Sequence, residues 1–292
     1  RSAFPSIPKA GPTASTTTIP AIATVNCILS AMARRSSETR RLIGPRTSRS
    51  AHEGGPGGPR SKKETGSGGS LYRLLAWLSP AYPIGAFSYS HGVETAVEEG
   101  LIRNRDSLVA WLRSVLANGT GRVDGALFAS AWRAAAAGDW PAFDAIAERA
   151  AAWRGTSEMA LESRQQGGSF LSITRTAWPH PALDAAHQRL AGELSLPVAV
   201  ALAAAAHGVP LDAALNGYLH AFVANLISAA VRAVPLGQSD GQRTLAALED
   251  TVTETAMAAI AVESLDEVGT ATPLLDWCSL RHETQYTRLF RS

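Results

Sequence analysis

The chain has 292 residues, 46% of them hydrophobic and 18% charged, which is enough for one large domain or two small ones. Its formal net charge of +2 is unevenly spread, because residues 1–70 hold 11 Lys and Arg against three acidic residues, whereas the rest of the chain holds 16 basic and 22 acidic residues. Binding to nucleic acid would need a basic face on the folded part, and the net negative charge of that part disfavours it.

Residues 1–70 come first in the chain, and their composition predicts disorder. The stretch EGGPGGPRSKKETGSGGS, like most of this segment, has too few apolar groups to offset the entropy of ordering. An Arg- and Ser-rich, acid-poor leader is equally compatible with a transit peptide, an upstream extension or a flexible arm. We therefore expect a disordered basic extension over 1–70 and a single folded domain over 71–292.

From residue 71 onward the periodicity is helical. SLVAWLRSVL places its apolar side chains on one helix face, and GDWPAFDAIAERAAAW opens with Asp139 as a helix N-cap and Pro141 in the first turn. GQRTLAALEDTVTETAMAAIAVESL is amphipathic over its length, and no segment alternates as a strand. The prediction is an all-α protein, a single bundle of about nine or ten helices.

Two uncharged runs, 194–211 and 213–231, approach the length of a membrane span. The first is rich in Ala and contains two prolines, and the second carries Asn216, His220 and Asn225. Both are more typical of buried helices in a bundle than of membrane spans, so we expect no membrane association.

The second run has an apolar stripe and, on its other side, a face of small residues. This small face comprises Gly217, Ala221, Ala224 and Ser228. It predicts close packing against a neighbouring helix backbone. The pair Gly167–Gly168 in ESRQQGGSF costs about 1 kcal/mol per residue relative to Ala inside a helix, and it too predicts a close backbone contact.

The stretch LSPAYPIGAFSYSHG (78–92) is an irregular, uncharged loop with three aromatic rings. Its prolines stop the preceding helix, and Gly100 suits the C′ position of the helix that follows. Ser90 directly precedes His91, which raises a hydrolase hypothesis. A nucleophile and its base usually come from separated positions, however, and the frame SYSHG is not a GxSxG elbow.

Metal and redox chemistry have little support in the sequence. Cys27 and Cys278 supply neither a disulfide framework nor a CxxC pattern, which fits a reducing cytoplasm. The seven histidines form no HxxxH pair, and His91 with Glu94 or His282 with Glu283 would supply only part of a metal shell. We predict no cofactor, no metal centre and no independent catalytic site.

The chain ends in SLRHETQYTRLFRS, where arginines and aromatic rings alternate. Arg and Tyr are typical anchors of protein interfaces, whereas a frayed helix end is the simpler alternative. As a docking segment, Tyr286–Ser292 could be removed without unfolding the bundle.

Four blocks of the sequence together resemble the UreF family of urease accessory proteins. They are SPAYPIGAFSYSHGVE, ESRQQGGSF, GYLHAFVANLISAAVRAVPLGQSDGQR and RHETQYTRLFRS, in the family's order and spacing over residues 71–292. The resemblance implies an all-α, dimer-forming, non-catalytic adaptor. It would bridge the UreD (or UreH) scaffold and the nickel-carrying GTPase UreG during nickel delivery to apo-urease, whose active-site lysine is carbamylated.

Partner-binding residues are predicted in three of these blocks. They are Pro83, Gly85, Phe87, Tyr89, Gly92, Glu94, Gln238, Gln242, Arg281, His282, Tyr286, Arg288, Phe290 and Arg291. The alternative function is a helical metal-binding protein or a hydrolase that uses Ser90 and His91.

Overall fold

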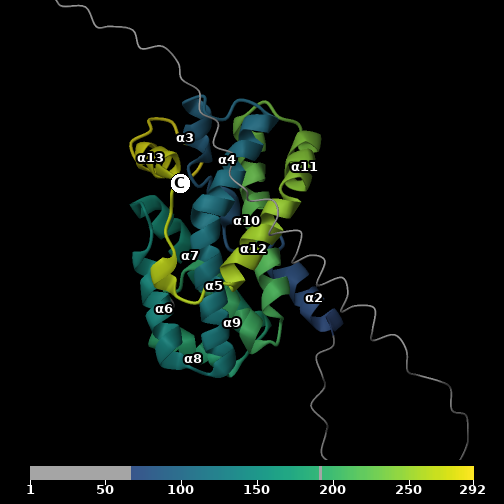
Figure 1. Cartoon of the computed structure of the whole chain (residues 1–292), viewed down its shortest axis with the longest axis vertical. Helices are drawn as coiled ribbons and strands as arrows, with labels where there is room; N and C mark the ends of the chain where they lie inside the picture. Colours follow the sequence, from purple (N-terminus) through teal and green to yellow (C-terminus); the bar gives the residue numbers. More distant parts are fainter. Residues whose placement is uncertain (1–66, 191–192) are drawn as a thin grey trace, which may run out of the picture. The chain divides into compact units, whose positions relative to one another are not determined.

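The computed structural model describes residues 67–190 and 193–292. These residues form α-helices joined by loops and short turns, with no β-strand among them (Figure 1). The predicted all-α fold is therefore confirmed. The disorder expected for residues 1–70 falls almost wholly outside the described residues and stays a prediction.

The helices follow one another closely along the chain. They are α2 (Ser67–Trp77), α3 (Val93–Glu98), α4 (Arg105–Asn118), α5 (Thr120–Ala137), α6 (Trp140–Ala152), α7 (Ser157–Ala177), α8 (Pro181–Arg189), α9 (Leu196–Ala206), α10 (Leu211–Ala233), α11 (Gln238–Ala247), α12 (Glu249–Ile260) and α13 (Pro273–His282). The structure also contains two short 3-10 helices, η1 (Ala86–Ser88) and η2 (Leu265–Glu267).

Local sequence signals set several of these boundaries. The Asp139 carboxylate accepts from the backbone N–H of Ala142 at the start of α6, with Pro141 in the first turn, as predicted. Gly100 follows the end of α3 in the left-handed conformation expected at C′. The amphipathic pattern that predicts one long helix near the end of the chain is interrupted at Leu248, between α11 and α12, where the N–H of Leu248 turns to the carbonyl of Leu245.

Helix α5 lies at the centre of the bundle, where it packs against α4, α6, α9, α10 and α12 (Figure 1). Helix α9 is buried from Pro197 to Ala204 because α5 and α7 cover it. A Cβ on Gly125 of α5 would come within 2.8 Å of the Ala259 Cβ on α12. The two helices therefore approach closely at this point.

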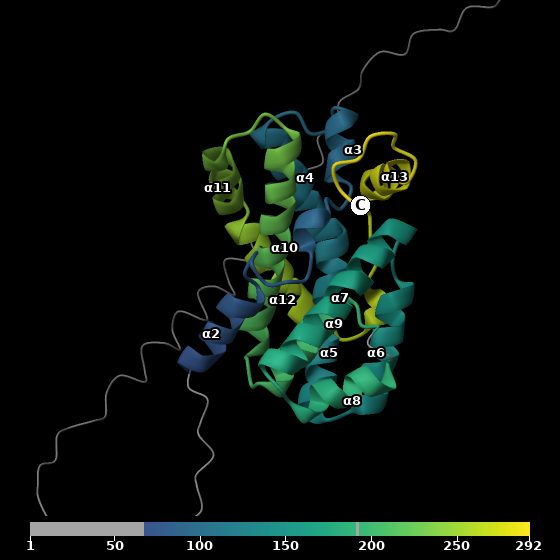
Figure 2. The same cartoon turned by 180° about the vertical axis from the view of Figure 1, so that it is seen from behind.

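Helix α10 is the only helix among the described residues that is long and apolar enough to cross a membrane by length and composition. It lies beside the loop and helices that form the site described below, as the reverse view shows (Figure 2). It packs against α3, α4, α5, α9, α11 and α12. Its packing against these helices in the core of the domain accounts for its apolar composition.

Gly167 confirms the predicted close backbone contact. A Cβ at this position of α7 would collide with the backbone of Leu194 and Ser195, which leads into α9. Only glycine leaves room for the chain to cross α7 here.

The small face of α10 behaves differently from the prediction. A Cβ on Gly217 would meet only the end of the flexible Leu78 side chain, Ala221 and Ala224 are half-buried, and Ser228 is exposed. The expectation of tight helix packing is wrong over most of this face, because the loop after α2 passes over it and leaves a cavity between them.

Candidate functional site

The loop between α2 and α3 has a buried layer and an exposed layer. The Tyr82 ring is buried, its hydroxyl lies 2.8 Å from the Thr174 hydroxyl, and its burial raises its pKa. Pro83 and Gly85 are exposed, and Gly85 has φ 76°, which allows the sharp turn into η1. Phe87 is 64% exposed, a large apolar side chain left in solvent.

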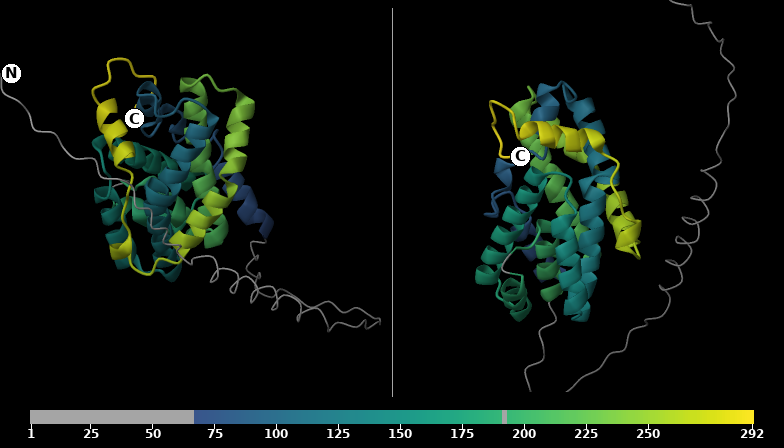
Figure 3. Two further views of the ribbon diagram at one scale, coloured as in Figure 1. Left: turned by 45° about the horizontal axis from the view of Figure 1, so that its top comes forward. Right: turned by 90° about the vertical axis from the view of Figure 1, so that its left-hand side faces the viewer.

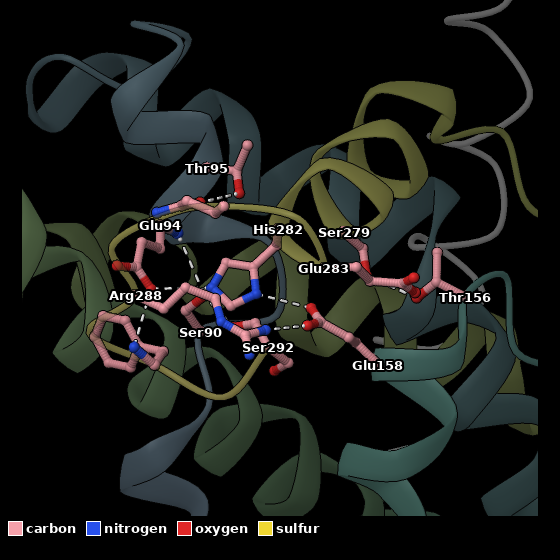
Figure 4. Close-up of polar contacts among 12 residues, drawn as sticks. Ser90, Glu94, Thr95, Thr156, Glu158, Ser279, His282, Glu283, Arg288 and Ser292 are labelled. Atoms are coloured by element: carbon pink, nitrogen blue, oxygen red, sulfur yellow. Dashed lines mark hydrogen bonds and ion pairs between the residues drawn. The ribbon is translucent and has the colours of Figure 1, made fainter.

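A polar cluster beneath this loop ties it to the end of the chain. His282 is fully buried, with Nδ1 2.8 Å from a Glu158 carboxylate oxygen and Nε2 3.0 Å from a Glu94 carboxylate oxygen. Both ring nitrogens face acceptors, so both can donate only when the imidazole is protonated. Figure 4 shows His282 with Glu94 on one side and Glu158 on the other. The ring therefore joins α13 to α3 and α7.

The backbone after α13 completes the hydrogen bonds of the same carboxylates. The N–H groups of Leu289 and Phe290 donate to the two oxygens of Glu94, at 2.6 and 3.0 Å. Arg288 Nη1 lies 2.8 Å from the second oxygen of Glu158. The segment is thus held by buried carboxylates, which argues against a frayed helix end.

The last residues of the chain form backbone hydrogen bonds with the residues just before α3. The N–H of Arg291 donates to the carbonyl of Ser88 at 2.8 Å, and the N–H of Ser90 donates to the carbonyl of Ser292 at 3.0 Å. The Ser292 hydroxyl donates to Glu162 at 2.8 Å. The end of the chain accordingly lies beside α3 (Figure 3). A segment anchored in this way cannot be removed without exposing or orphaning the groups it pairs with.

Ser90 and His91 are not engaged with each other. The Ser90 hydroxyl is buried, donates to the Ser292 carbonyl and accepts from the N–H of Glu94 at 3.3 Å. His91, with φ 55°, points its ring nitrogens to Glu162 (3.2 Å) and to the Thr120 hydroxyl (2.8 Å). The hydrolase hypothesis built on Ser90 as nucleophile is therefore wrong.

Glu162 is a buried carboxylate beside the cluster. Burial by itself would raise its pKa, but His91, the Ser292 hydroxyl and Arg154 outweigh that effect and hold the pKa below its ordinary value. The carboxylate is thus kept ionised inside the protein by its partners.

The outer layer of the site is aromatic and basic. The Arg232 guanidinium, at the end of α10, lies 3.6 Å from the centre of the Phe87 ring and 4.4 Å from that of Phe290. The Arg291 guanidinium lies 5.7 Å from the Tyr89 ring centre. Cation–π stacking of this kind stabilises arginine in a fixed position. Burial lowers the pKa of Arg232.

Of the charged residues in this site, sequence reasoning predicted Glu94 but missed Arg232, Glu158 and Glu162. Arg232 is the only Arg or Lys in α10, and that isolation in an apolar helix is a signal that the sequence does carry. Glu162 is the first residue of the block ESRQQGGSF, and Glu158 lies four residues before it. The prediction for this block is based on its two glycines and not on these acids.

The predicted partner-binding residues fall into an exposed and a buried group. The exposed group is Pro83, Gly85, Phe87, Gln238, Gln242, Arg281, Tyr286, Arg288 and Arg291. The buried group is Tyr89, Gly92, Glu94, His282 and Phe290. The buried residues hold the exposed ones in place. Gln238 and Gln242 lie apart from the cluster, on α11, which packs on α10 and α4.

A second buried ion pair lies next to the cluster. Arg154 Nη1 is 2.8 Å from Asp124, and the Tyr218 hydroxyl donates to the same carboxylate at 2.7 Å. Burial and the Asp124 charge raise the pKa of Tyr218 well above its ordinary value. Within residues 67–190 and 193–292, no group of three or more His, Cys, Asp and Glu side chains is arranged to hold a metal ion.

Fold and site together define an all-α protein in which a buried acid–histidine cluster fixes an exposed aromatic and basic surface. The family model for UreF matches residues 102–249. The urease accessory protein UreF of Granulibacter bethesdensis is 51% identical over 223 residues, covering 76% of this chain and 94% of that protein. The UreF proteins of Rhodopseudomonas palustris strain BisB5 (53% identity, 76% of this chain and 91% of that protein) and Azorhizobium caulinodans (50%, 78% and 98%) are similarly close. The chain belongs to the UreF family of urease accessory proteins.

Proposed function

We propose that this urease accessory protein is a non-catalytic adaptor of urease maturation. It would bind the UreD (UreH) scaffold and the UreG GTPase and so allow nickel to reach apo-urease. In this role Ni²⁺ is cargo of the complex, and the protein works as a homodimer in the cytoplasm without a cofactor of its own.

The observation that carries the proposal is the exposed surface above the acid–histidine cluster. Phe87 and Leu289 are 64% and 63% exposed, and Tyr286 is fully exposed. Arg288 and Arg291 are exposed as well, although Nη1 of Arg288 is paired with Glu158. Exposed aromatic rings and forked cations on a fixed backbone suit a partner surface that carries carboxylates.

The test is capture of purified UreD and UreG by the full-length protein and by two surface variants, Phe87→Ala and Tyr286→Ala. Both side chains project into solvent, so the fold should persist while an anchor of the surface is lost. Each variant should weaken capture by about thirtyfold, the scale of an interface hot spot.

Met257→Ala is the matched control, because Met257 is 66% exposed on α12, outside this surface. It should bind like the unmodified protein. Full retention of UreD and UreG by both Phe87→Ala and Tyr286→Ala would contradict the adaptor surface proposed here.

A second candidate function rests on one geometric observation. Thr120, His91 and Glu162 form a hydroxyl–imidazole–carboxylate series with spacings of 2.8 and 3.2 Å, and all three line a cavity. The same order of groups serves hydrolases as nucleophile, base and orienting acid. Ester hydrolysis by the purified protein that Thr120→Ala abolishes and Thr120→Ser retains would favour this candidate. Absence of turnover by the unmodified protein would exclude it.

A further inference from the structure

A cavity of about 220 Å³ lies between α7, α10 and the loop that follows α2. Apolar side chains, among them Tyr82, Ile84 and Phe222, contribute much of its lining. The buried pair Asp124–Arg154 also lines it. The space therefore combines apolar walls with the charged side chains of Asp124, Arg154 and Glu162.

Arg154 is incompletely paired for a buried cation. Its side chain is 7% exposed, and only Nη1 contacts Asp124. Nε and Nη2 have no hydrogen-bond acceptor among the described residues. Buried N–H groups of a guanidinium are almost always satisfied, so an acceptor from outside the chain is expected here.

The small face of α10 keeps the cavity open. Ala221, Ala224 and Ser228 line it, and a larger side chain at any of them would project into the space. The run of small residues in the sequence thus has a physical consequence other than tight packing.

We propose that this cavity is a binding site for a small neutral molecule with an apolar body and a carbonyl oxygen, such as a carboxamide. The carbonyl would accept from the guanidinium of Arg154, and the body would lie against Phe222 and Tyr82.

Charge decides between a neutral ligand and an anion. Asp124 already neutralises Arg154, and Glu162 lies close enough for Arg154 to lower its pKa. A further anion would add uncompensated negative charge inside the protein, which burial penalises heavily. A neutral carbonyl satisfies the same donors without that penalty.

Size fits an aromatic amide. An apolar cavity of about 150 Å³ is known to hold benzene, so the larger volume here leaves room for a ring and an amide group. The cavity shares Phe87 with the proposed adaptor surface, but its occupancy is measured without any partner, so the two proposals can fail separately.

Benzamide, benzoate and toluene form a matched set of probes that share a ring and differ in acceptor and charge. Their binding to the full-length protein is measured by saturation-transfer NMR and by the thermal midpoint. Benzamide should bind saturably and at least about tenfold tighter than the other two, the ratio that a hydrogen bond to a charged group supplies.

Ala224→Leu places a large side chain in the cavity, whereas Ala213→Leu makes the same change at an exposed position of α10. The first should lose benzamide binding and the second should retain it. A crystal structure of the unmodified protein with benzamide locates the carbonyl even if Ala224→Leu does not fold.

Three results would overturn the proposal. If benzoate or toluene binds as tightly as benzamide, a neutral carbonyl acceptor is not what the cavity recognises. Unchanged binding by a folded Ala224→Leu variant, or crystal density away from Arg154, would place the molecule elsewhere. No binding of any probe, with only water in the cavity, would mean that solvent satisfies Arg154.

Discussion

Gly167 shows how a single missing side chain shapes the bundle, since the chain entering α9 crosses α7 in direct contact with its backbone. Gly167→Ala should force the two segments apart and destabilise the protein by about 1–3 kcal/mol, the usual cost of overpacking. Urea unfolding at neutral pH measures this change. Gly68→Ala is the control, because a Cβ there meets nothing within 4 Å, and an equal loss in both variants would contradict the steric explanation.

Glu162 predicts a specific pH dependence. Its pKa in the folded protein lies below its ordinary value of 4.5, so its contribution to stability is present above pH 4.5 and is lost as the pH falls through the folded pKa. The stability difference between the unmodified protein and Glu162→Gln should therefore be constant near neutrality and shrink below pH 4.5.

Urea unfolding between neutral pH and acid gives this difference directly. Glu249→Gln, an exposed acid in the first turn of α12, provides the comparison, since it lacks the partners of Glu162. A Glu162→Gln difference that stays constant throughout the acid range would show that the carboxylate gains nothing from those partners.

At the scale of elements, the segment after α13 acts as part of the fold as well as part of the surface. Removing Tyr286–Ser292 deletes the backbone donors to Glu94, the Ser292 donor to Glu162 and the Arg288 partner of Glu158, and it leaves the contacts of these carboxylates with His282 and His91. A hydrogen bond to a charged group contributes about 1.5–3 kcal/mol, so the loss of several should make the truncated protein unfold at a clearly lower temperature.

Thermal unfolding followed by circular dichroism tests this, with proteolysis of the loop between α2 and α3 as a local readout. Tyr286→Ala leaves every one of these hydrogen bonds in place and should unfold like the unmodified protein. A truncated protein with an unchanged midpoint would restore the view of the segment as a dispensable docking tail.

Local features of the sequence were sufficient to predict the helices but not the site. Asp139 and Gly100 act on neighbours within a few positions, so capping rules locate them. His282 meets Glu158 and Glu94 across 124 and 188 positions, and no periodicity relates them. The interruption at Leu248 and the open small face of α10 likewise depend on what packs there.

At the scale of the whole molecule, we expect the stability of the bundle to depend on α2 but not on the residues before it. Removing residues 1–66 should leave the stability within about 0.5 kcal/mol, because that segment is too polar to build a core. Removing residues 1–77 also takes Trp77, which is 1% exposed and packs edge-on against Phe170 and Trp178. That loss should cost about 3–5 kcal/mol, the scale of a buried Trp.

Urea unfolding of the two truncated proteins separates these outcomes. Equal stability of both would mean that α2 adds nothing to the core. If the deletion of residues 1–66 already destabilises the protein, the extension has a structural role that its composition does not predict.

The bond between Ser90 and Ser292 spans 202 positions, and this separation has a consequence for the order of folding. Closing so long a loop is entropically expensive, whereas helices form from local contacts, so the helices should assemble first. During refolding, Glu94 and Glu158 would stay hydrated until the end of the chain arrives. Helical ellipticity should accordingly recover before the amide protons of Leu289 and Phe290 become protected from exchange, and the aromatic and basic surface should be the last part of the molecule to mature.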